Sequence, residues 1–195
     1  MINQNNAKNI RPPAVASMFY PVGAAELRKA VQNYLSNAGT EEDVSQFKKE
    51  EFAELRTLIV PHAGYIYSGK IAASAYRLLE QNKNQFKRVL LLGPAHRVLL
   101  EGAAFPEMDA FETPLGEITL DKELIEKILA EFSWISVSDK AHAEEHCLEV
   151  QLPFLQETLG EFKLLPLVVG DAKTELLAAL IQQFSKDHET LIVIS

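Results

Sequence analysis

Apolar residues fall into two kinds of pattern along this chain. Short runs rich in valine, isoleucine and leucine predict buried strands over residues 57–60, 89–92, 162–169 and 190–194. Apolar residues at helical spacing predict helices over residues 24–37, 68–80, 121–131, 144–159 and 173–185. The helix over 144–159 is expected to kink or break at Pro153, because proline cannot donate the helical hydrogen bond.

The order of these elements predicts an α/β fold. A strand, a helix and a strand between residues 57 and 92 describe a βαβ unit, whose strands run parallel. Residues 101–120 instead carry short alternating pieces around Pro106, Pro114 and Gly116, which predict an excursion with a hairpin. We therefore expect a three-layer α/β/α architecture with a mostly parallel central sheet, which this excursion can make mixed.

The length of the chain favours a single domain. Its 195 residues, 47% of them hydrophobic, suffice for one substantial core and are too few for two. Residues 1–23 are polar and contain prolines, which predicts an arm packed on the domain formed by residues 24–195. The acidic segment 41–54 is poorly patterned and is expected to be a loop with a short helix.

Charge and composition argue against several classes of protein. The net charge is −8 and no run of Lys or Arg could follow a phosphate backbone, so nucleic acid is not an expected partner. No apolar run approaches the roughly 20 residues of a membrane span. The first residues lack a secretory signal and Cys147 is the one cysteine, so we expect a cytoplasmic protein without an internal disulfide.

Two histidines follow predicted strands by a few residues. His62 comes after the strand over 57–60, and His96 comes after the strand over 89–92. The carboxyl ends of adjacent parallel strands meet at one edge of a sheet, where α/β folds bind ligands. Neutral imidazoles at such an edge can ligate a transition metal, although a catalytic site usually needs a third protein ligand. The alternative is a pair of loop histidines that bond only to the backbone.

A second histidine pair occurs in His142-Ala143-Glu144-Glu145-His146. This matches the H-x-x-E-H pattern of inverted zinc metallopeptidases, in which Glu145 would act as a general base. The predicted helix begins near Glu144, which would leave His142 in the preceding loop and argues against a peptidase. Cys147 is expected to be a buried structural cysteine, since neighbours on a helix point apart and His146 would not activate its thiol.

Several segments together resemble the Memo family, whose bacterial members are often called AmmeMemoRadiSam system protein B. The segments that carry this resemblance are residues 11–21, 60–69, 91–96, 111–116, 145–153 and 165–170. The resemblance implies a fold shared with class III extradiol dioxygenases of the LigB type. It also implies a metal site with His62 and His96 as ligands, His146 as a catalytic residue in the same pocket, and Tyr65 and Glu145 as pocket residues.

The family resemblance also sets expectations for cofactor, function and partners. It implies a non-haem iron or copper site with redox or dioxygenase-related ancestry, and association with radical-SAM and AMMECR-type proteins. A Ser-Asp-x-x-His loop and a third ligand are expected after Ser195, so we expect the domain to be incomplete at its C-terminus and ring-opening activity to be absent. Cys147 does not match the family's ligand cysteine. The alternative is a non-catalytic binding or scaffold module whose pocket takes a protein or peptide partner, and a small-molecule ligand is also compatible with the site.

Overall fold

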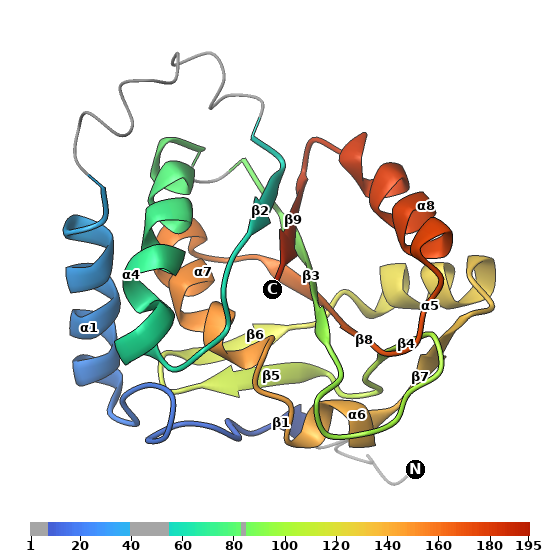
Figure 1. Cartoon of the computed structure of the whole chain (residues 1–195), viewed down its shortest axis with the longest axis horizontal. Coiled ribbons are helices and arrows are strands. Elements are labelled where there is room, and N and C mark those ends of the chain that lie inside the picture. Colours follow the sequence, from blue (N-terminus) through green and yellow to red (C-terminus); the bar gives the residue numbers. More distant parts are fainter. Residues whose placement is uncertain (1–7, 40–54, 83–84) are drawn as a thin grey trace, which may run out of the picture.

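The computed structural model describes residues 8–39, 55–82 and 85–195, and the predicted loop over 41–54 falls outside them (Figure 1). Its helices are α1 (Ala24–Ser36), α4 (Tyr65–Tyr76), α5 (Lys122–Glu131), α6 (Asp139–Ala143), α7 (Leu152–Leu159) and α8 (Thr174–Ser185), with 3₁₀ turns η1 (Arg77–Asn82) and η2 (Glu149–Gln151). Its strands are β1 (Ile10–Arg11), β2 (Thr57–Ile59), β3 (Arg88–Pro94), β4 (Ala103–Phe105), β5 (Ala110–Thr113), β6 (Gly116–Thr119), β7 (Ile135–Val137), β8 (Lys163–Val169) and β9 (Thr190–Ile194).

Six strands form the central sheet in the order β2-β9-β3-β8-β4-β7. The pairings β2 with β9, β9 with β3, and β3 with β8 are parallel, whereas β4 pairs with β8 in the antiparallel direction. Helices α1, α4 and α7 lie on one side of this sheet and α5 and α8 on the other (Figure 1). The prediction of a three-layer α/β/α fold with a mostly parallel, mixed sheet is confirmed.

The strand order corrects one sequence expectation, that β2 and β3 are neighbours. Strand β9 lies between them and pairs with both. Four consecutive residues of β9 are buried, so this strand needs cover on both faces and belongs inside the sheet. Strand β2 has only its middle residue buried, with Thr57 and Ile59 exposed, which suits the edge.

Two of the predicted helices differ from the structure by more than one residue at an end. Helix α4 begins at Tyr65, three residues before the predicted start at Ser68, and passes into η1 after Tyr76. The predicted helix over 144–159 is wrong as one element, because residues 144–148 are irregular and α7 begins only at Leu152. Pro153 then falls in the first turn of α7, where its missing N–H leaves no helical hydrogen bond unmade.

A second, three-stranded sheet has the order β1-β5-β6. Strands β5 and β6 pair in the antiparallel direction and form the hairpin expected within residues 101–120. Strand β1, from the predicted N-terminal arm, pairs parallel to β5. This contact places β1 beside α6, below the chain that leads to α7 (Figure 1).

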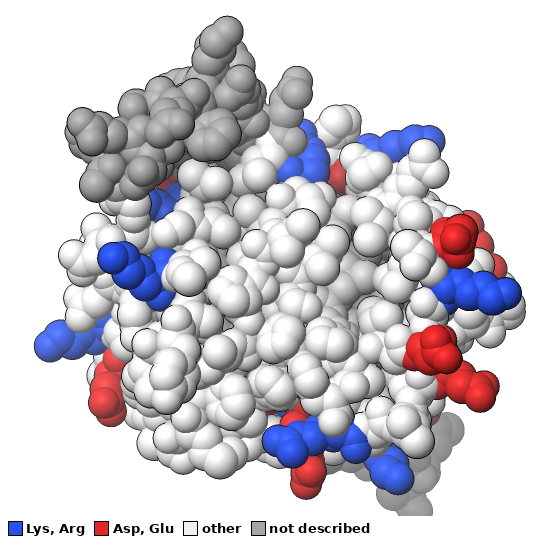
Figure 2. Space-filling model, in the orientation of Figure 1, with Lys and Arg blue, Asp and Glu red and all other residues white. Residues whose placement is uncertain are grey.

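One face of the molecule is poor in charge. In Figure 2 the charged side chains lie mainly around the rim of the view, and the centre is occupied by uncharged residues. Among the described residues, four large apolar side chains on β2 and α4 are exposed: Ile59, Ile66, Tyr67 and Ile71. Within the described chain there is no helix long and apolar enough to cross a membrane.

Candidate metal centre

Three histidines meet at the edge of the sheet where β2 and β3 end. His62 follows β2, His96 follows β3, and His146 lies in the irregular segment after α6. The ring centroids are 5.2 Å apart for His62 and His96, 5.6 Å for His62 and His146, and 4.7 Å for His96 and His146. One ring nitrogen from each histidine lies within 4.8 Å of the other two. The structure thus brings the two predicted ligands together with a third imidazole.

A glycine at the end of β3 allows this close approach. A Cβ atom on Gly93 would lie 2.5 Å from the Sγ atom of Cys147 and 2.9 Å from a methyl group of Leu148. Both distances are too short for a side chain, so only glycine lets the segment after α6 lie against β3. His146 reaches His96 because its chain neighbour Cys147 packs there.

His96 is held by the carboxylate of Glu145. Its Nδ1 lies 2.9 Å from Glu145 Oε1, and its backbone N–H donates to Oε2 at 2.7 Å. Oε1 also accepts from the backbone amides of His146 and Cys147. A carboxylate only accepts at neutral pH, so Nδ1 of His96 carries a proton, and in the neutral ring the lone pair then lies on Nε2. This is the arrangement by which a carboxylate orients a metal-ligating histidine.

The charge of Glu145 is stabilised despite its burial. Burial alone would raise its pKa, but hydrogen bonds from His96 and from the Cys147 amide outweigh that effect and lower the pKa of Glu145 to about 2. The carboxylate is therefore ionised throughout the neutral range and keeps its hold on His96.

The other two imidazoles favour the neutral form. Burial lowers the pKa of His62, and the neighbouring His96 lowers it further. Burial also lowers the pKa of His146, and His96 and His62 act in the same direction against the opposing effect of Glu145. Neutral rings keep the lone pairs that a metal ion requires.

The surroundings of His146 suit a bound ion. The ring of Phe19, from the segment after β1, lies with its centroid 4.9 Å from that of His146. The Nδ1 atom of His146 is buried and makes no hydrogen bond among the described residues, although it lies 3.2 Å from Glu145 Oε1. The carboxylate beside it favours a proton on Nδ1, which in the neutral ring leaves the lone pair on Nε2 for an ion.

A second grouping of potential ligands lies beside the first. His96, Glu145 and Cys147 also bring their ligand atoms within 4.8 Å of one another. Glu145, however, already accepts four hydrogen bonds, and burial raises the pKa of the Cys147 thiol, which lies 3.3 Å from the carbonyl oxygen of Pro94. The three-histidine group is the better candidate because His62 and His146 favour the neutral form and not all of the ring nitrogens in the group are engaged.

A buried ion pair supports the segment that carries Glu145 and His146. Arg11 and Glu149 are 1% and 0% exposed, and Arg11 Nη1 lies 2.7 Å from Glu149 Oε2. Arg11 also donates to the carbonyl oxygens of His142 and Glu145, each at 2.7 Å. Glu149 in turn accepts from Tyr20 and from the backbone of the N-terminal segment. These bonds join β1 and the residues after it to both ends of the segment 142–149.

Three residues singled out from the sequence lie in the core. Tyr65 is buried, and its hydroxyl donates to the carbonyl oxygen of Val150. His142 is buried in α6 with Nε2 2.9 Å from the carbonyl oxygen of Ala104. Because His142 and His146 do not share a helix, the two-histidine helix of the peptidase interpretation is absent from this segment. Cys147 is 0% exposed, a position that suits a structural role.

Sequence reasoning missed five residues around the site. These are Arg11, Phe19, Glu149, Gln151 and Ser195. One signal was available: Glu149 and Gln151 interrupt an apolar stretch that the pattern places in the core, and buried polar side chains require partners. The partners themselves have no local signature, because they come from the two ends of the chain.

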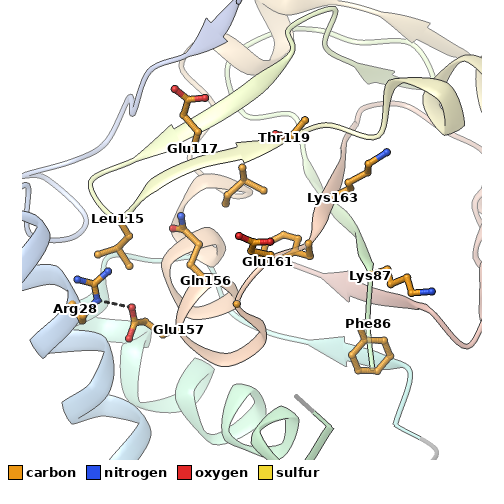
Figure 3. Close-up of a pocket in the computed structure, with 13 residues that line it drawn as sticks. Arg28, Phe86, Lys87, Leu115, Glu117, Thr119, Gln156, Glu157, Glu161 and Lys163 are labelled. Carbon is orange, nitrogen blue, oxygen red and sulfur yellow. Dashed lines mark hydrogen bonds and ion pairs between the residues drawn. The ribbon is translucent and has the colours of Figure 1, made fainter. Parts of the chain in front are cut away.

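A cavity of about 800 Å³ lies far from the histidines, where β3 and β8 begin (Figure 3). Its walls carry charges of both signs, from Arg28, Lys87 and Lys163 and from Glu117, Glu157 and Glu161. Arg28 and Glu157 already pair at 2.9 Å. None of the three candidate ligands lines this cavity, and its mixed charge favours no ligand class.

Known proteins match nearly the whole chain. The family model described as Memo-like protein matches residues 11–195. A MEMO1 family protein of Aquifex aeolicus is 39% identical over 190 residues, which cover 95% of this chain and 66% of that protein. A MEMO1 family protein of Methanobrevibacter smithii is 35% identical, with 95% and 67% covered, and one of Ignicoccus hospitalis is 37% identical, with 91% and 62% covered. The chain spans about two thirds of the length of these relatives. The resemblance predicted from the sequence is confirmed, and the chain belongs to the Memo family.

Proposed function

We propose that this chain binds one transition-metal ion between His62, His96 and His146. The observation that carries the proposal is the approach of three ring nitrogens, one from each histidine, to within 4.8 Å of one another. Imidazole nitrogen suits iron, copper, zinc and nickel, and iron or copper is what the family resemblance leads us to expect. His146 would be a ligand in this arrangement, which extends the two-histidine site predicted from the sequence.

The chain prepares the site for such an ion in three ways. Glu145 holds the His96 ring with its Nε2 lone pair free, and Phe19 covers one side of His146. The side chain of His96 is 37% exposed, which leaves the centre accessible from solvent. A bound metal would supply Lewis acidity or electron transfer there, and a redox or dioxygenase-related activity is the finer part of this proposal.

Metal binding can be tested by titration of the metal-free protein. Isothermal titration calorimetry with Cu(II), and with Fe(II) under anaerobic conditions, should give one site per chain. His62→Ala, His96→Ala and His146→Ala should each weaken binding by at least about tenfold, since each removes a ligand. His188→Ala is the matched control, because His188 is exposed and lies outside the cluster. Equal affinity in all four variants would rule out the proposed centre.

A second candidate function is the binding of a protein or peptide partner without catalysis. The exposed apolar side chains of α4 and of β2, the edge strand among the described residues, favour it. Removal of metal with a chelator should then leave peptide binding unchanged, whereas a strict dependence on metal would contradict it. Association with radical-SAM and AMMECR-type proteins stays a prediction.

A further inference from the structure

His62 stands at the end of a buried chain of hydrogen bonds. The Tyr76 hydroxyl donates to Gln151 Oε1 at 2.9 Å, and Gln151 Nε2 lies 2.6 Å from the Oγ atom of Ser195. Ser195 Oγ is 3.2 Å from His62 Nδ1. Tyr76 and Gln151 are 0% and 1% exposed, so water does not compete for the bond between them.

The orientation of the Gln151 amide follows from its neighbours. Its Nε2 also donates to the carbonyl oxygen of Pro61 at 2.9 Å. A carbonyl oxygen can only accept, and the reversed amide would place two oxygens in repulsive contact at that distance. Nε2 therefore faces Pro61, and its second hydrogen points to Ser195.

The hydroxyl of Ser195 must then act as an acceptor from Gln151. Two protein groups can accept its own hydrogen, the carbonyl oxygen of Val60 at 3.3 Å and Nδ1 of His62 at 3.2 Å. Donation to Val60 gives all three neighbours of the hydroxyl a hydrogen bond, because Ser195 then accepts from both Gln151 and the Nδ1–H of His62. Donation to His62 would instead leave the Val60 carbonyl oxygen without its bond from Ser195.

We infer that Gln151 is a positioning residue which, through Ser195, fixes His62 in the tautomer that carries its proton on Nδ1. In this tautomer the lone pair of His62 lies on Nε2. A neutral histidine in water favours the opposite tautomer, so the protein selects the minor form. The value of this selection for metal capture rests on the proposed function, but the tautomer is a property of the metal-free chain.

The tautomer can be measured directly in metal-free protein. Long-range ¹H–¹⁵N correlation spectra of the ¹⁵N-labelled full chain distinguish the protonated ring nitrogen from the bare one. Spectra are recorded about two pH units above the ordinary histidine pKa, where the ring is neutral, and His62→Gln assigns the signals. We expect a protonated Nδ1 in the unmodified protein, and a protonated Nε2 there would overturn the inference.

Variants separate positioning from a general structural role. Ser195→Ala and Gln151→Leu should raise the population of the Nε2–H form of His62, whereas Ser195→Thr, which retains the hydroxyl, should preserve the Nδ1–H form. Gln156→Leu is the matched control, since Gln156 makes similar amide bonds to Thr113 and Gly116 away from the site. His96, held by Glu145, should keep its tautomer throughout and reports that the fold is intact.

Two results distinguish a failure of this inference from a failure of the proposed function. An unchanged His62 tautomer in Ser195→Ala, with His96 signals intact, would overturn the positioning role even if the protein binds metal. A failure to bind metal would overturn the proposed function and leave the tautomer measurement standing.

Discussion

The two histidines predicted as ligands are oriented by different chemistry. His62 is held by a neutral hydroxyl that belongs to an amide and phenol network. His96 is held by the ionised carboxylate of Glu145. Each partner favours a proton on Nδ1 of its ring, but only the partner of His96 is charged.

The charged partner of His96 needs support from other parts of the fold. Hydrogen bonds to charged groups are about twice as strong as neutral ones, and a buried charge must be paired. The segment that carries Glu145 is accordingly braced by the buried pair of Arg11 and Glu149, while the segment around His62 needs only neutral bonds. We therefore expect substitutions on the carboxylate side to have the larger effects.

The largest effect is expected for Glu149→Gln. This change leaves the Arg11 guanidinium buried without its counter-ion, which should lower the free energy of unfolding by about 3–5 kcal/mol. Urea denaturation followed by circular dichroism measures the loss. Arg28→Gln breaks the exposed pair with Glu157 and should cost only about 0–1 kcal/mol. Equal losses in the two variants would contradict the view that buried charge holds the carboxylate side together.

The next effect concerns pH and His142. Burial lowers the pKa of His142 to about 4 from an ordinary value of 6.5, so the unfolded chain takes up this proton first as the pH falls. Its contribution is therefore lost between pH 6.5 and pH 4 and amounts to about 3 kcal/mol at most. In His142→Gln the fall in stability over this window should be smaller, as measured by urea titrations at several pH values. The exposed His188→Gln should retain the full dependence, and the same slope in both variants would contradict the assignment.

A smaller effect is expected for Glu145→Gln on metal affinity. The amide cannot accept from all four donors that Glu145 satisfies, and it removes the charge that supports His96. Affinity should fall by about 10–100-fold, as is typical when the partner of a ligating histidine is changed. Calorimetric titration with Cu(II) measures this loss. Glu144→Gln changes the adjacent, exposed carboxylate and should bind as the unmodified protein does.

The smallest effect is expected for Ser195→Ala on metal affinity. Loss of one neutral hydrogen bond is worth about 0.5–1.5 kcal/mol, which corresponds to a few-fold to roughly tenfold weaker binding. The same titration serves for this variant. A loss as large as that of Glu145→Gln would show that the two sides of the site are equivalent and would remove the contrast drawn between them.

The sequence patterns located elements well where their signal is local. The strands over 89–92 and 190–194 lie within β3 and β9, because unbroken apolar runs report burial on both faces whatever their neighbours are. The prediction of one helix over 144–159 is wrong because the structure of this segment depends on a contact between distant residues. Its apolar stripe is real, but Glu149 within it requires Arg11, which lies 138 residues away, and this pairing shapes the irregular segment before α7.

The α/β class, the hairpin excursion and the placement of His62 and His96 after strands were readable from residue order, because each depends on spacing within a few residues. The strand order could not be read in this way, since β9 enters between β2 and β3 from the far end of the chain. The same holds for the approach of His146 and for the choice of Ser195 and Glu145 as partners of the two predicted ligands. These features rest on hydrogen bonds and close contacts between distant segments, and folding alone brings such segments together.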